Sequence, residues 1–344
     1  MLIDPNEKSG DRAEQPIVSP HLSPLCAPLC GVPIQSGQAA RKLIAIVGPT
    51  GAGKTELAIS LAGTFDAEIV NADSRQVYWY MDIGTAKPTP EQQAQAPHHL
   101  LDIVNPDENF NLALYQEMAN QSIADIQQRG KLPLLVGGSG LYVWAVVEGW
   151  CIPRLEPDRA LRLKLETRAK EEGQNLLYEE LKRLDPVAAQ RIDPRNIRRV
   201  IRALEVCYKT GRPFSEQYRK EPPPYPVLII GLTLDREELY RRVDNRMDSM
   251  VEKGLVAEVQ GLMAQGYGLD LPAMSGVGYK EIGQYLQGKW DLATAVQKAK
   301  FATHRFIRHQ YAWFHLSDER ISWLESGAGV EEKAETMVAS FVKD

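Results

Sequence analysis

One stretch near the start of the chain limits its possible folds more than any other. The apolar run 43–47 is followed by Gly-Pro-Thr-Gly-Ala-Gly-Lys-Thr at 48–55 and by a segment of helical character at 56–62. A buried strand, a loop with G-x-x-x-x-G-K-[ST] spacing and a helix are the required context of a phosphate-binding loop. We therefore predict an α/β fold, with a P-loop NTPase-like parallel sheet flanked by helices and a site for a di- or triphosphate.

The residue types of this loop explain how it would bind phosphate. Its glycines let successive backbone N–H groups turn toward an anion, and the N-terminus of the following helix adds positive potential. Lys54 supplies a point charge for the outer phosphate oxygens, and the Thr55 hydroxyl is a ligand for a Mg²⁺ that bridges them. The alternative is a glycine-rich turn without a ligand. The motif alone does not identify the reaction.

A second candidate site follows the next predicted strand, 67–72. This strand leads into Asp73, and functional groups of open parallel sheets gather at the carboxyl ends of the strands. A carboxylate beside the phosphate loop is positioned to accept a proton from an attacking nucleophile. Asp73 could equally cap a following helix, with Ser74 and Gln76 in its first turn, and the sequence does not separate the two interpretations. Arg75 adds a cation that could meet phosphate.

Two further stretches invite a functional interpretation. The predicted strand 132–136 opens into a second glycine-rich loop, in which Ser139 could donate a hydrogen bond to phosphate. No acidic residue ends this strand, so the metal ligand typical of ATP-hydrolysing motors is missing there. His98 and His99 suggest a metal site, but adjacent side chains on a strand point to opposite faces, which argues against two ligands for one ion.

The pattern then changes to charged helices. Residues 154–220 hold 17 Lys and Arg against 11 Asp and Glu, a local charge of +6 that leaves −11 for the rest of a chain of net charge −5. We predict a helix that starts at Asp193-Pro194, buries an apolar stripe and carries Arg198, Arg199 and Arg202 on its other faces. Three guanidinium groups suit phosphate contacts, which favours a polyanion such as RNA as partner. A solvated charged face is the alternative.

After a proline-rich linker the chain returns to the α/β pattern. We predict a strand at 227–232, an arginine-rich helix, a loop at 274–278, a long basic helix at 291–314, a last strand at 321–324 and a terminal helix. Phe301, Phe306 and Trp313 of the long helix are expected in the core, the commoner place for aromatic side chains at this spacing. The domain boundaries that follow are a flexible tail at 1–40, an α/β core at 41–153 and 225–344, and a helical insertion at 154–224.

Composition and cysteine content argue against several classes. No apolar run reaches the roughly 20 residues of a membrane span, and the first residues lack the apolar segment of a secretory signal. Four cysteines are too few and too scattered for a disulfide framework, and Cys26 and Cys30 lack the second pair of a zinc site. We expect a reduced, cytoplasmic setting.

Six motifs, in order along the chain, resemble those of the tRNA dimethylallyltransferase family. They lie at 48–55, 73–78, 81–88, 135–142, 202–206 and 276–279, and the match runs from about residue 41 to residue 324. Ser139 stands where many members of that family have Thr, which keeps the hydroxyl. The stretch 303–310 departs from the usual Arg- and Lys-containing pattern, so we carry no role over to it.

The resemblance implies transfer of a dimethylallyl group from dimethylallyl diphosphate to N6 of the adenosine 3′-adjacent to the anticodon, in tRNAs that read codons beginning with U. It implies that Asp73 is the general base and that Mg²⁺ and Thr55 help to hold the diphosphate. Diphosphate-binding residues would be Gly48, Pro49, Thr50, Gly51, Ala52, Gly53, Lys54 and Thr55, with Arg246 or, as second choice, Arg242.

The resemblance also assigns contacts to the anticodon stem-loop of tRNA, with the helical insertion as a clamp and the chain acting as a monomer. These contacts fall on Asp73, Ser74, Arg75, Gln76, Ser139, Arg162, Arg198, Arg199, Val200, Ile201, Arg202, Gly276, Val277, Gly278, Tyr279, Lys280 and Glu281. The target base would have to leave its stack to reach the site.

Three other functions are compatible with parts of this pattern. An isopentenyltransferase acting on free AMP or ADP would share the site but would not need the basic insertion. A small-substrate P-loop kinase would use the same loop to hold ATP. A nucleotide-dependent RNA-binding switch would bind without chemistry, and Asp73 argues against it.

Overall fold

The computed structural model describes residues 41–153, 155, 158–217 and 219–343. The predicted tail at 1–40, with Cys26 and Cys30, lies outside the described residues. Of the helices in the described ranges, none is long and apolar enough to cross a membrane.

Six parallel strands form one sheet, in the order β3-β2-β4-β1-β5-β6. Their bounds are β1 Leu43–Val47, β2 Ala67–Asn71, β3 His98–His99, β4 Leu132–Val136, β5 Val227–Thr233 and β6 Ile321–Glu325. The predicted parallel α/β fold is therefore confirmed. Strands β1, β2, β4 and β5 each have a strand on both sides, so their edges are covered. Their near-continuous apolar sequences also require both faces to be buried, and helices cover those faces.

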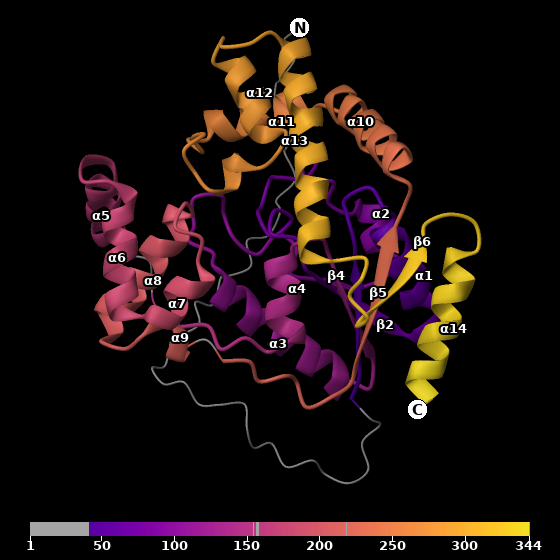
Figure 1. Cartoon of the computed structure of the whole chain (residues 1–344). Coiled ribbons are helices and arrows are strands. Elements are labelled where there is room, and N and C mark those ends of the chain that lie inside the picture. Colours follow the sequence, from indigo (N-terminus) through magenta and orange to yellow (C-terminus); the bar gives the residue numbers. More distant parts are fainter. Residues whose placement is uncertain (1–40, 154, 156–157, 218, 344) are drawn as a thin grey trace, which may run out of the picture. The chain divides into compact units, whose positions relative to one another are not determined.

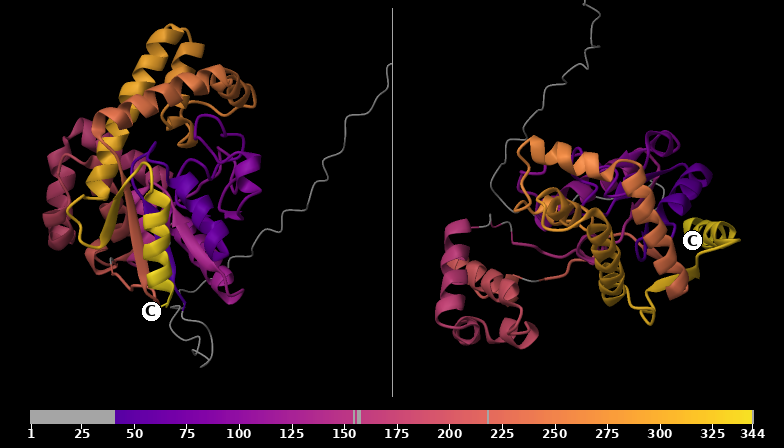
Figure 2. Two further views of the ribbon diagram at one scale, coloured as in Figure 1. Left: turned by 90° about the vertical axis from the view of Figure 1, so that its right-hand side faces the viewer. Right: turned by 90° about the horizontal axis from the view of Figure 1, so that it is seen from above.

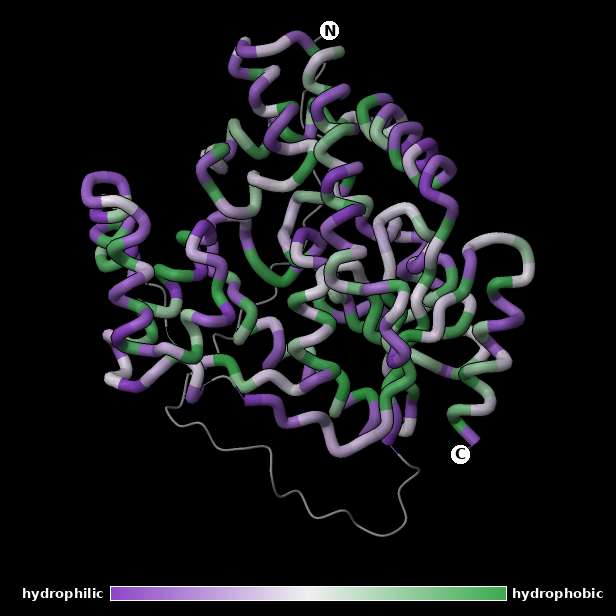
Figure 3. Tube along the Cα trace, in the orientation of Figure 1, coloured by the Kyte–Doolittle hydropathy of each residue, from purple (hydrophilic) through white to green (hydrophobic). Residues whose placement is uncertain are grey.

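Alternate residues of each central strand face two different layers of helices. Ile44 and Ile46 pack with α1 (Lys54–Phe65) and α14 (Val330–Lys343), whereas Leu43, Ala45 and Val47 pack with α3 (Leu112–Gln128) and α4 (Gly140–Val147). Figure 1 shows α14 beside the edge strand β6 and α3 and α4 on the other side of the sheet. In Figure 3, hydrophobic colour concentrates along the strands and hydrophilic colour along the outer helices.

A group of short helices between α4 and β5 has its own apolar core. Its members are α5 Arg159–Glu171, α6 Gln174–Leu184, α7 Pro186–Arg191, α8 Ile197–Thr210 and α9 Phe214–Gln217, and they pack together around residues such as Leu165, Leu177 and Leu204. Figure 2 shows this group together at one side of the sheet. The chain enters and leaves it at one point, since Cys151 N donates to Arg219 O (2.8 Å) and Glu221 N to Gly149 O (2.8 Å). A separate domain with boundaries at 154 and 224 stays a prediction.

The predicted start of helix α8 was wrong. The Asp193 carboxylate accepts from the backbone N–H of Arg195 (2.9 Å), and Asn196 N donates to Asp193 O (2.8 Å), so 193–196 form a turn. Asn196 caps the helix instead, with its side chain accepting from the N–H of Arg199 (3.3 Å). An aspartate before proline suits a turn as well as a cap, and local sequence did not separate them.

The remaining helices lie between β5 and β6. They are α10 Arg236–Glu252, α11 Leu255–Ala264, the 3₁₀ turn η1 Ala273–Ser275, α12 Tyr279–Leu286 and α13 Leu292–Trp313, and four-residue α2 Pro90–Gln93 lies earlier, before β3. Helices α10 to α13 share an apolar core with Val77, Tyr78 and Met81 from the segment after β2. This packing ties them to the carboxyl end of β2.

The prediction of buried aromatic residues on α13 was wrong for two of the three. Phe301 is 58% exposed and Phe306 is 40% exposed, whereas Trp313 packs against the core. The buried stripe of α13 consists of Ala295, Ala299, Ile307 and Gln310, and neither phenylalanine falls on it. Helical spacing gives the period of an apolar stripe but does not determine which face the neighbouring elements cover, so the two phenylalanines fall outside the buried face.

Glu205 is the electrostatic centre of the helical group. Its fully buried carboxylate accepts from Arg162 Nε and Nη2 (2.9 and 2.8 Å), from Arg202 Nη1 (2.5 Å) and from the backbone N–H of Asp158 (2.8 Å). Burial alone would raise the pKa of Glu205, but the hydrogen bonds from Arg162 and Arg202 outweigh it and lower that pKa. Two of the predicted tRNA-binding arginines, both partly exposed, are therefore paired with a buried carboxylate.

We predict that Glu205→Gln lowers the free energy of unfolding by about 2 kcal/mol at pH 7, because charge-assisted hydrogen bonds to a buried group are lost. Since the folded-state pKa is lowered, the wild-type advantage is present above the unfolded-state pKa and disappears as the pH falls through the folded-state value. Thermal unfolding followed by circular dichroism measures both effects. The exposed Glu216→Gln is the matched control, and equal stability of wild type and Glu205→Gln at pH 7 would contradict the prediction.

Candidate functional site

The loop between β1 and α1 has the backbone that an anion site requires. Gly51 and Gly53 have φ of +84° and +86°, in the left-handed region that side chains avoid. A Cβ at Gly48 would lie 2.3 Å from the carbonyl oxygen of Leu232, so only glycine permits this approach of β5. The Lys54 ammonium donates to the carbonyl oxygen of Pro49 (2.8 Å) within the loop.

Lys54 is a half-buried cation, and among the described residues its ammonium has one hydrogen-bond acceptor, the carbonyl oxygen of Pro49. Burial lowers the pKa of Lys54 to about 8, Asp73 opposes this effect, and the positive charge of Arg246 adds to it. A phosphate anion between Lys54 and Arg246 would remove this penalty, because it supplies the opposite charge at close range.

Asp73 follows β2 and sits in a turn rather than at the start of a helix. Its carboxylate accepts from the backbone N–H of Arg75 (2.8 Å), and its own N–H donates to Asn71 Oδ1 (3.0 Å). No helix begins within the next ten residues of the chain, all of them described. The helix-capping interpretation of Asp73 was therefore wrong, and its carboxylate keeps lone pairs for a ligand.

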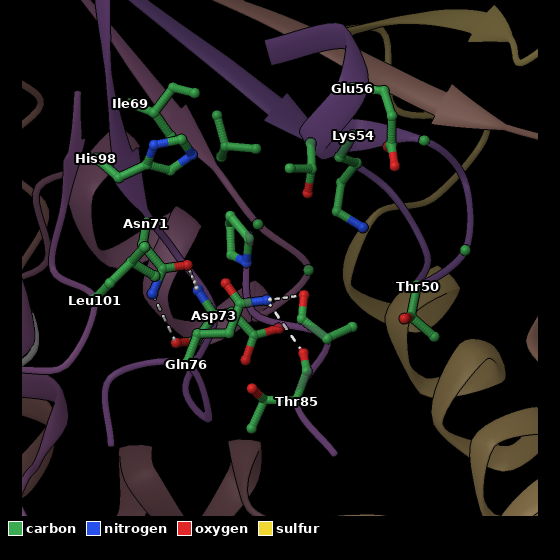
Figure 4. Close-up of a pocket in the computed structure, with 18 of the residues that line it drawn as sticks. Thr50, Lys54, Glu56, Ile69, Asn71, Asp73, Gln76, Thr85, His98 and Leu101 are labelled. Carbon is green, nitrogen blue, oxygen red and sulfur yellow. Dashed lines mark hydrogen bonds between the residues drawn. The ribbon is translucent and has the colours of Figure 1, made fainter. Parts of the chain in front are cut away.

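One cavity collects the phosphate loop and Asp73. Figure 4 shows Lys54 and Asp73 entering it from different elements, with Gln76 held by the carbonyl oxygens of Thr85 (3.2 Å) and Ala86 (3.1 Å). The lining comprises Thr50, Gly51, Gly53, Lys54, Thr55, Glu56, Ile69, Asn71, Asp73, Gln76, Thr85, Ala86, Pro88, His98, Leu101, Val136, Gly137, Gly138, Arg246 and Gln310. It therefore combines two cations, two carboxylates (Glu56 and Asp73) and a short apolar wall.

Of the two arginines predicted to face a diphosphate, the structure brings one to this cavity. Arg246 of α10 lines it, whereas Arg242 is exposed and its guanidinium pairs with Glu238 (2.8 Å). The two residues lie on the same face of α10, about 6 Å apart along its axis. Arg246 is therefore the one at the level of the cavity, and Arg242 lies one turn away, beside Glu238.

Gln310 is a site residue that the sequence reasoning missed. Its side-chain oxygen accepts from the backbone N–H of Thr50 (2.9 Å), and its amide nitrogen donates to Gly138 O (3.1 Å). This buried residue of α13 thus joins the phosphate loop to the second glycine-rich loop. A glutamine on the otherwise apolar buried stripe of a helix was the available signal.

The second glycine-rich loop needs glycine because it lies against the end of β2. A Cβ at Gly137 would be 2.1 Å from the carbonyl oxygen of Ala72. Next to it, Ser139 Oγ accepts from the backbone N–H of Ser74 (3.0 Å) and donates to Ser74 Oγ (3.3 Å). Ser139 thus supports the turn that holds Asp73.

A second contact joins the segment after Asp73 to helices α11 and α12. Glu258 of α11 accepts from the backbone N–H groups of Asp82 (3.0 Å), Ile83 (2.7 Å) and Gly84 (3.1 Å). The Tyr279 hydroxyl donates to the same carboxylate (2.5 Å), and its ring lies where a Cβ at Gly84 would be, 2.5 Å away. This packing brings the motifs at 81–88 and 276–279 into direct contact.

Two more cationic groups fix the same segment. Lys87 is buried, and its ammonium donates to Tyr78 O (3.0 Å) and pairs with Asp82 and Asp102. Arg75 donates to the carbonyl oxygens of Pro272 (2.5 Å) and Ala273 (3.2 Å) at η1. Both cations thus hold the loop that carries Asp73 and Gln76.

The other predicted contacts to tRNA differ in accessibility. Lys280, Arg198 and Arg199 are exposed, whereas Gly276, Gly278, Tyr279 and Glu281 are buried and Val277 is half-buried. The Glu281 carboxylate accepts from Gly278 N (2.9 Å). Val200 and Ile201 are buried in the helical group, so their side chains are not available to an external partner.

The two adjacent histidines have separate partners. His99 Nε2 pairs with Glu68 (2.7 Å), and His98 Nδ1 lies 2.8 Å from Ala96 O. Within the described ranges, no group of three or more His, Cys, Asp and Glu side chains is arranged to hold a metal ion. Mg²⁺ commonly uses only one or two protein ligands beside phosphate and water. The oxygen atoms of Thr55 and Asp73 in one cavity fit that need.

Known proteins share this architecture. The family described as IPP transferase matches residues 76–317, and the family described as isopentenyl transferase matches residues 41–103. The curated tRNA dimethylallyltransferase of Roseiflexus castenholzii is 52% identical over 296 residues, which cover 86% of this chain and 97% of that protein.

Two solved structures are similar over 88% of the chain. The full-length tRNA isopentenylpyrophosphate transferase of Bacillus halodurans is 38% identical, with a TM-score of 0.66 and 97% of that chain covered. A eukaryotic dimethylallyltransferase, whose crystal structures capture it acting on tRNA, is 27% identical, with a TM-score of 0.76 and 80% of that chain covered.

We predict that inorganic diphosphate binds more weakly as the pH rises from 7 to 9.5. The ammonium form of Lys54, whose pKa is about 8 in the free protein, is the form that attracts an anion. Isothermal titration should show up to about a tenfold loss per pH unit above that pKa. At each pH, the association constant of wild type is divided by that of Lys54→Met, so that the titration of diphosphate itself cancels. A ratio of association constants that does not change with pH would contradict the prediction.

Proposed function

Since this chain belongs to the IPP transferase family, we propose that it transfers a dimethylallyl group from dimethylallyl diphosphate to an adenosine of tRNA. The chain is a transferase, and its relatives carry the name tRNA dimethylallyltransferase. The finer part of the proposal is that the acceptor atom is N6 of the adenosine 3′-adjacent to the anticodon, in tRNAs that read codons beginning with U.

The observation that carries the proposal is that two half-buried cations and the Asp73 carboxylate line one cavity. Lys54 and Arg246 are suited to the two phosphoryl groups of a leaving diphosphate, and Asp73 is suited to a proton. Asn71 and Arg75 fix Asp73 within its own turn. Ser139 of the second glycine-rich loop holds the adjacent Ser74, so the position of Asp73 is set before substrate arrives.

The proposed reaction is one substitution at the first carbon of the dimethylallyl group. The N6 lone pair forms the C–N bond while the C–O bond breaks, and its electrons leave with the diphosphate. Asp73 accepts the proton that the amino group loses. The P-loop N–H groups, Lys54 and Arg246 stabilise the negative charge that grows on the departing oxygens.

We propose Mg²⁺ as the metal of this site, held by the Thr55 hydroxyl. When bound, it would neutralise part of the diphosphate charge. The Thr55 hydroxyl lines the cavity beside Lys54, and Mg²⁺ at such sites commonly has one protein ligand with phosphate and water as the others, which supports this proposal.

For tRNA, we propose that the exposed Arg198 and Arg199 contact phosphates directly. Both lie in the first turn of α8, where the helix dipole disfavours cations, and a phosphate would relieve that cost. Arg162 and Arg202, bound to Glu205, would position this turn rather than grip RNA themselves. Lys280 and Arg75 would contribute from the loops around η1 and α12.

A transfer assay separates the proposal from its alternatives. Protein, Mg²⁺ and labelled dimethylallyl diphosphate are incubated with unmodified tRNA or with AMP, and nucleosides are identified by mass spectrometry. We expect prenylated adenosine from tRNA alone. Product from AMP would indicate a free-nucleotide enzyme, and tight ATP binding without product would indicate a kinase or a nucleotide-dependent switch.

We predict that Asp73→Asn lowers kcat about 10²- to 10⁴-fold, because the amide cannot accept the proton. Asparagine keeps an oxygen for the N–H of Arg75, so the turn and the KM for tRNA should change little. Single-turnover kinetics with labelled donor measure the chemical step. A kcat within threefold of wild type would exclude Asp73 as the base.

We predict that the double variant Arg198→Ala/Arg199→Ala weakens tRNA binding and reduces the slope of log K against log salt by about 2, one for each lost phosphate contact. Filter binding at several salt concentrations measures this slope. Arg195→Ala, which removes an exposed arginine already paired with Asp193 (2.8 Å), is the control. An unchanged slope in the double variant would contradict the prediction.

A further inference from the structure

Trp79 and Tyr80 are exposed aromatic side chains on the segment that follows Asp73. Trp79 is 46% exposed and Tyr80 is 50% exposed, although both flank residues that pack in an apolar core. Tyr80 also has a φ of +66°, a left-handed conformation that bulky side chains rarely adopt. Such a conformation is strained, so the surrounding structure must hold it in place.

The surrounding contacts fix these two residues without covering them. Trp79 N donates to Val104 O (3.0 Å), which anchors the backbone. The ring of Tyr80 stacks on that of Tyr267, with centroids 6.4 Å apart and planes 24° apart. We call Trp79, Tyr80 and Tyr267 the aromatic platform.

The platform lies beside the residues proposed to contact RNA. The loop between α11 and η1 is contacted at both ends. Near its start, Tyr267 stacks on Tyr80, and at its end the carbonyl oxygen of Pro272 accepts from Arg75. Arg75 and Tyr80 come from the same short segment, so both flank this one loop. Figure 1 shows the segment after β2, in purple, under α11 and α12.

Charge at the platform favours a nucleobase over a backbone phosphate. The carboxylates of Asp107 and Glu108 interact electrostatically with the Tyr267 hydroxyl. They would repel a phosphate, whereas the face of a base is uncharged and stacks on aromatic rings regardless of its identity.

We propose that the aromatic platform stacks an unpaired base of the RNA substrate, and thereby holds the loop around the target adenosine. This inference rests on the proposed function, since it takes tRNA as the partner. A loop base outside the catalytic cavity would stack on Trp79 or Tyr80 and so stay apart from its neighbours in the RNA. The target base can leave its own stack only when the loop is opened in this way.

The first test uses Tyr80→Gly and Trp79→Ala with an anticodon stem-loop as acceptor. Glycine accepts a φ of +66°, so Tyr80→Gly removes the ring and relieves the backbone cost. We expect the KM for RNA to rise roughly tenfold in each variant, in line with the stacking of one base, while kcat and the KM for dimethylallyl diphosphate change less than twofold. Tyr80→Phe and Leu316→Ala, which removes an exposed side chain elsewhere, should match wild type. A KM for RNA within twofold of wild type in both platform variants would overturn the proposal.

The second test locates the base and does not depend on turnover. Anticodon stem-loops with one abasic position each are titrated into wild type and Tyr80→Gly, and tryptophan fluorescence is compared with that of Trp79→Phe. We expect one loop position at which loss of the base weakens RNA binding by wild type but not by Tyr80→Gly. We also expect RNA to quench tryptophan fluorescence in wild type by an amount that is missing in Trp79→Phe. Quenching that is equal in wild type and Trp79→Phe would overturn the platform even if transfer is active. A wild type that is quenched through Trp79 yet transfers nothing would refute the proposed function and keep the platform.

Discussion

The carboxylate of Glu258 is the contact on which the rest of the site depends. It accepts hydrogen bonds from the backbone N–H groups of residues 82–84 and from the hydroxyl of Tyr279. One carboxylate thus joins three elements through four donors, and bonds to a charged acceptor are stronger than neutral ones. Gly84 permits the contact because any Cβ would overlap the Tyr279 ring. Helices α11 and α12 are thereby fixed to the loop that begins at Asp73, and the positions of Arg75 and Gln76 follow from that attachment.

A second dependence is electrostatic. The carboxyl ends of β1 and β2 bring Lys54 and Asp73 to one cavity, while α10 and α13 supply Arg246 and Gln310 from far along the chain. The lowered pKa of Lys54 reflects a cation that burial and Arg246 destabilise. An anion that binds between them reverses this cost, so the free protein is organised for a ligand with several negative oxygens.

Local sequence predicted the parts of the fold that local physics controls. The strands, the phosphate loop and the position of Asp73 followed from apolar runs and glycine spacing, and the structure has them. Gln310 and Glu258 escaped notice because their partners lie 260 and about 175 residues away in the chain. Phe301 and Phe306 were assigned to the core because helical spacing gives a period, but only the neighbours of α13 determine which face is buried.

The charge excess of the helical segment shows why counting charges is a weak guide to binding. Of four arginines assigned to tRNA in this segment, Arg162 and Arg202 are bound to the buried Glu205, which a count of charges registers only as one acid among eleven. Arg198 and Arg199 keep exposed guanidinium groups at the start of α8, where the helix dipole opposes them. Their cost in the free protein, like that of the half-buried Lys54, falls when phosphate arrives. Cations placed against their own local field are therefore stronger evidence for an anionic partner than the net charge of the segment.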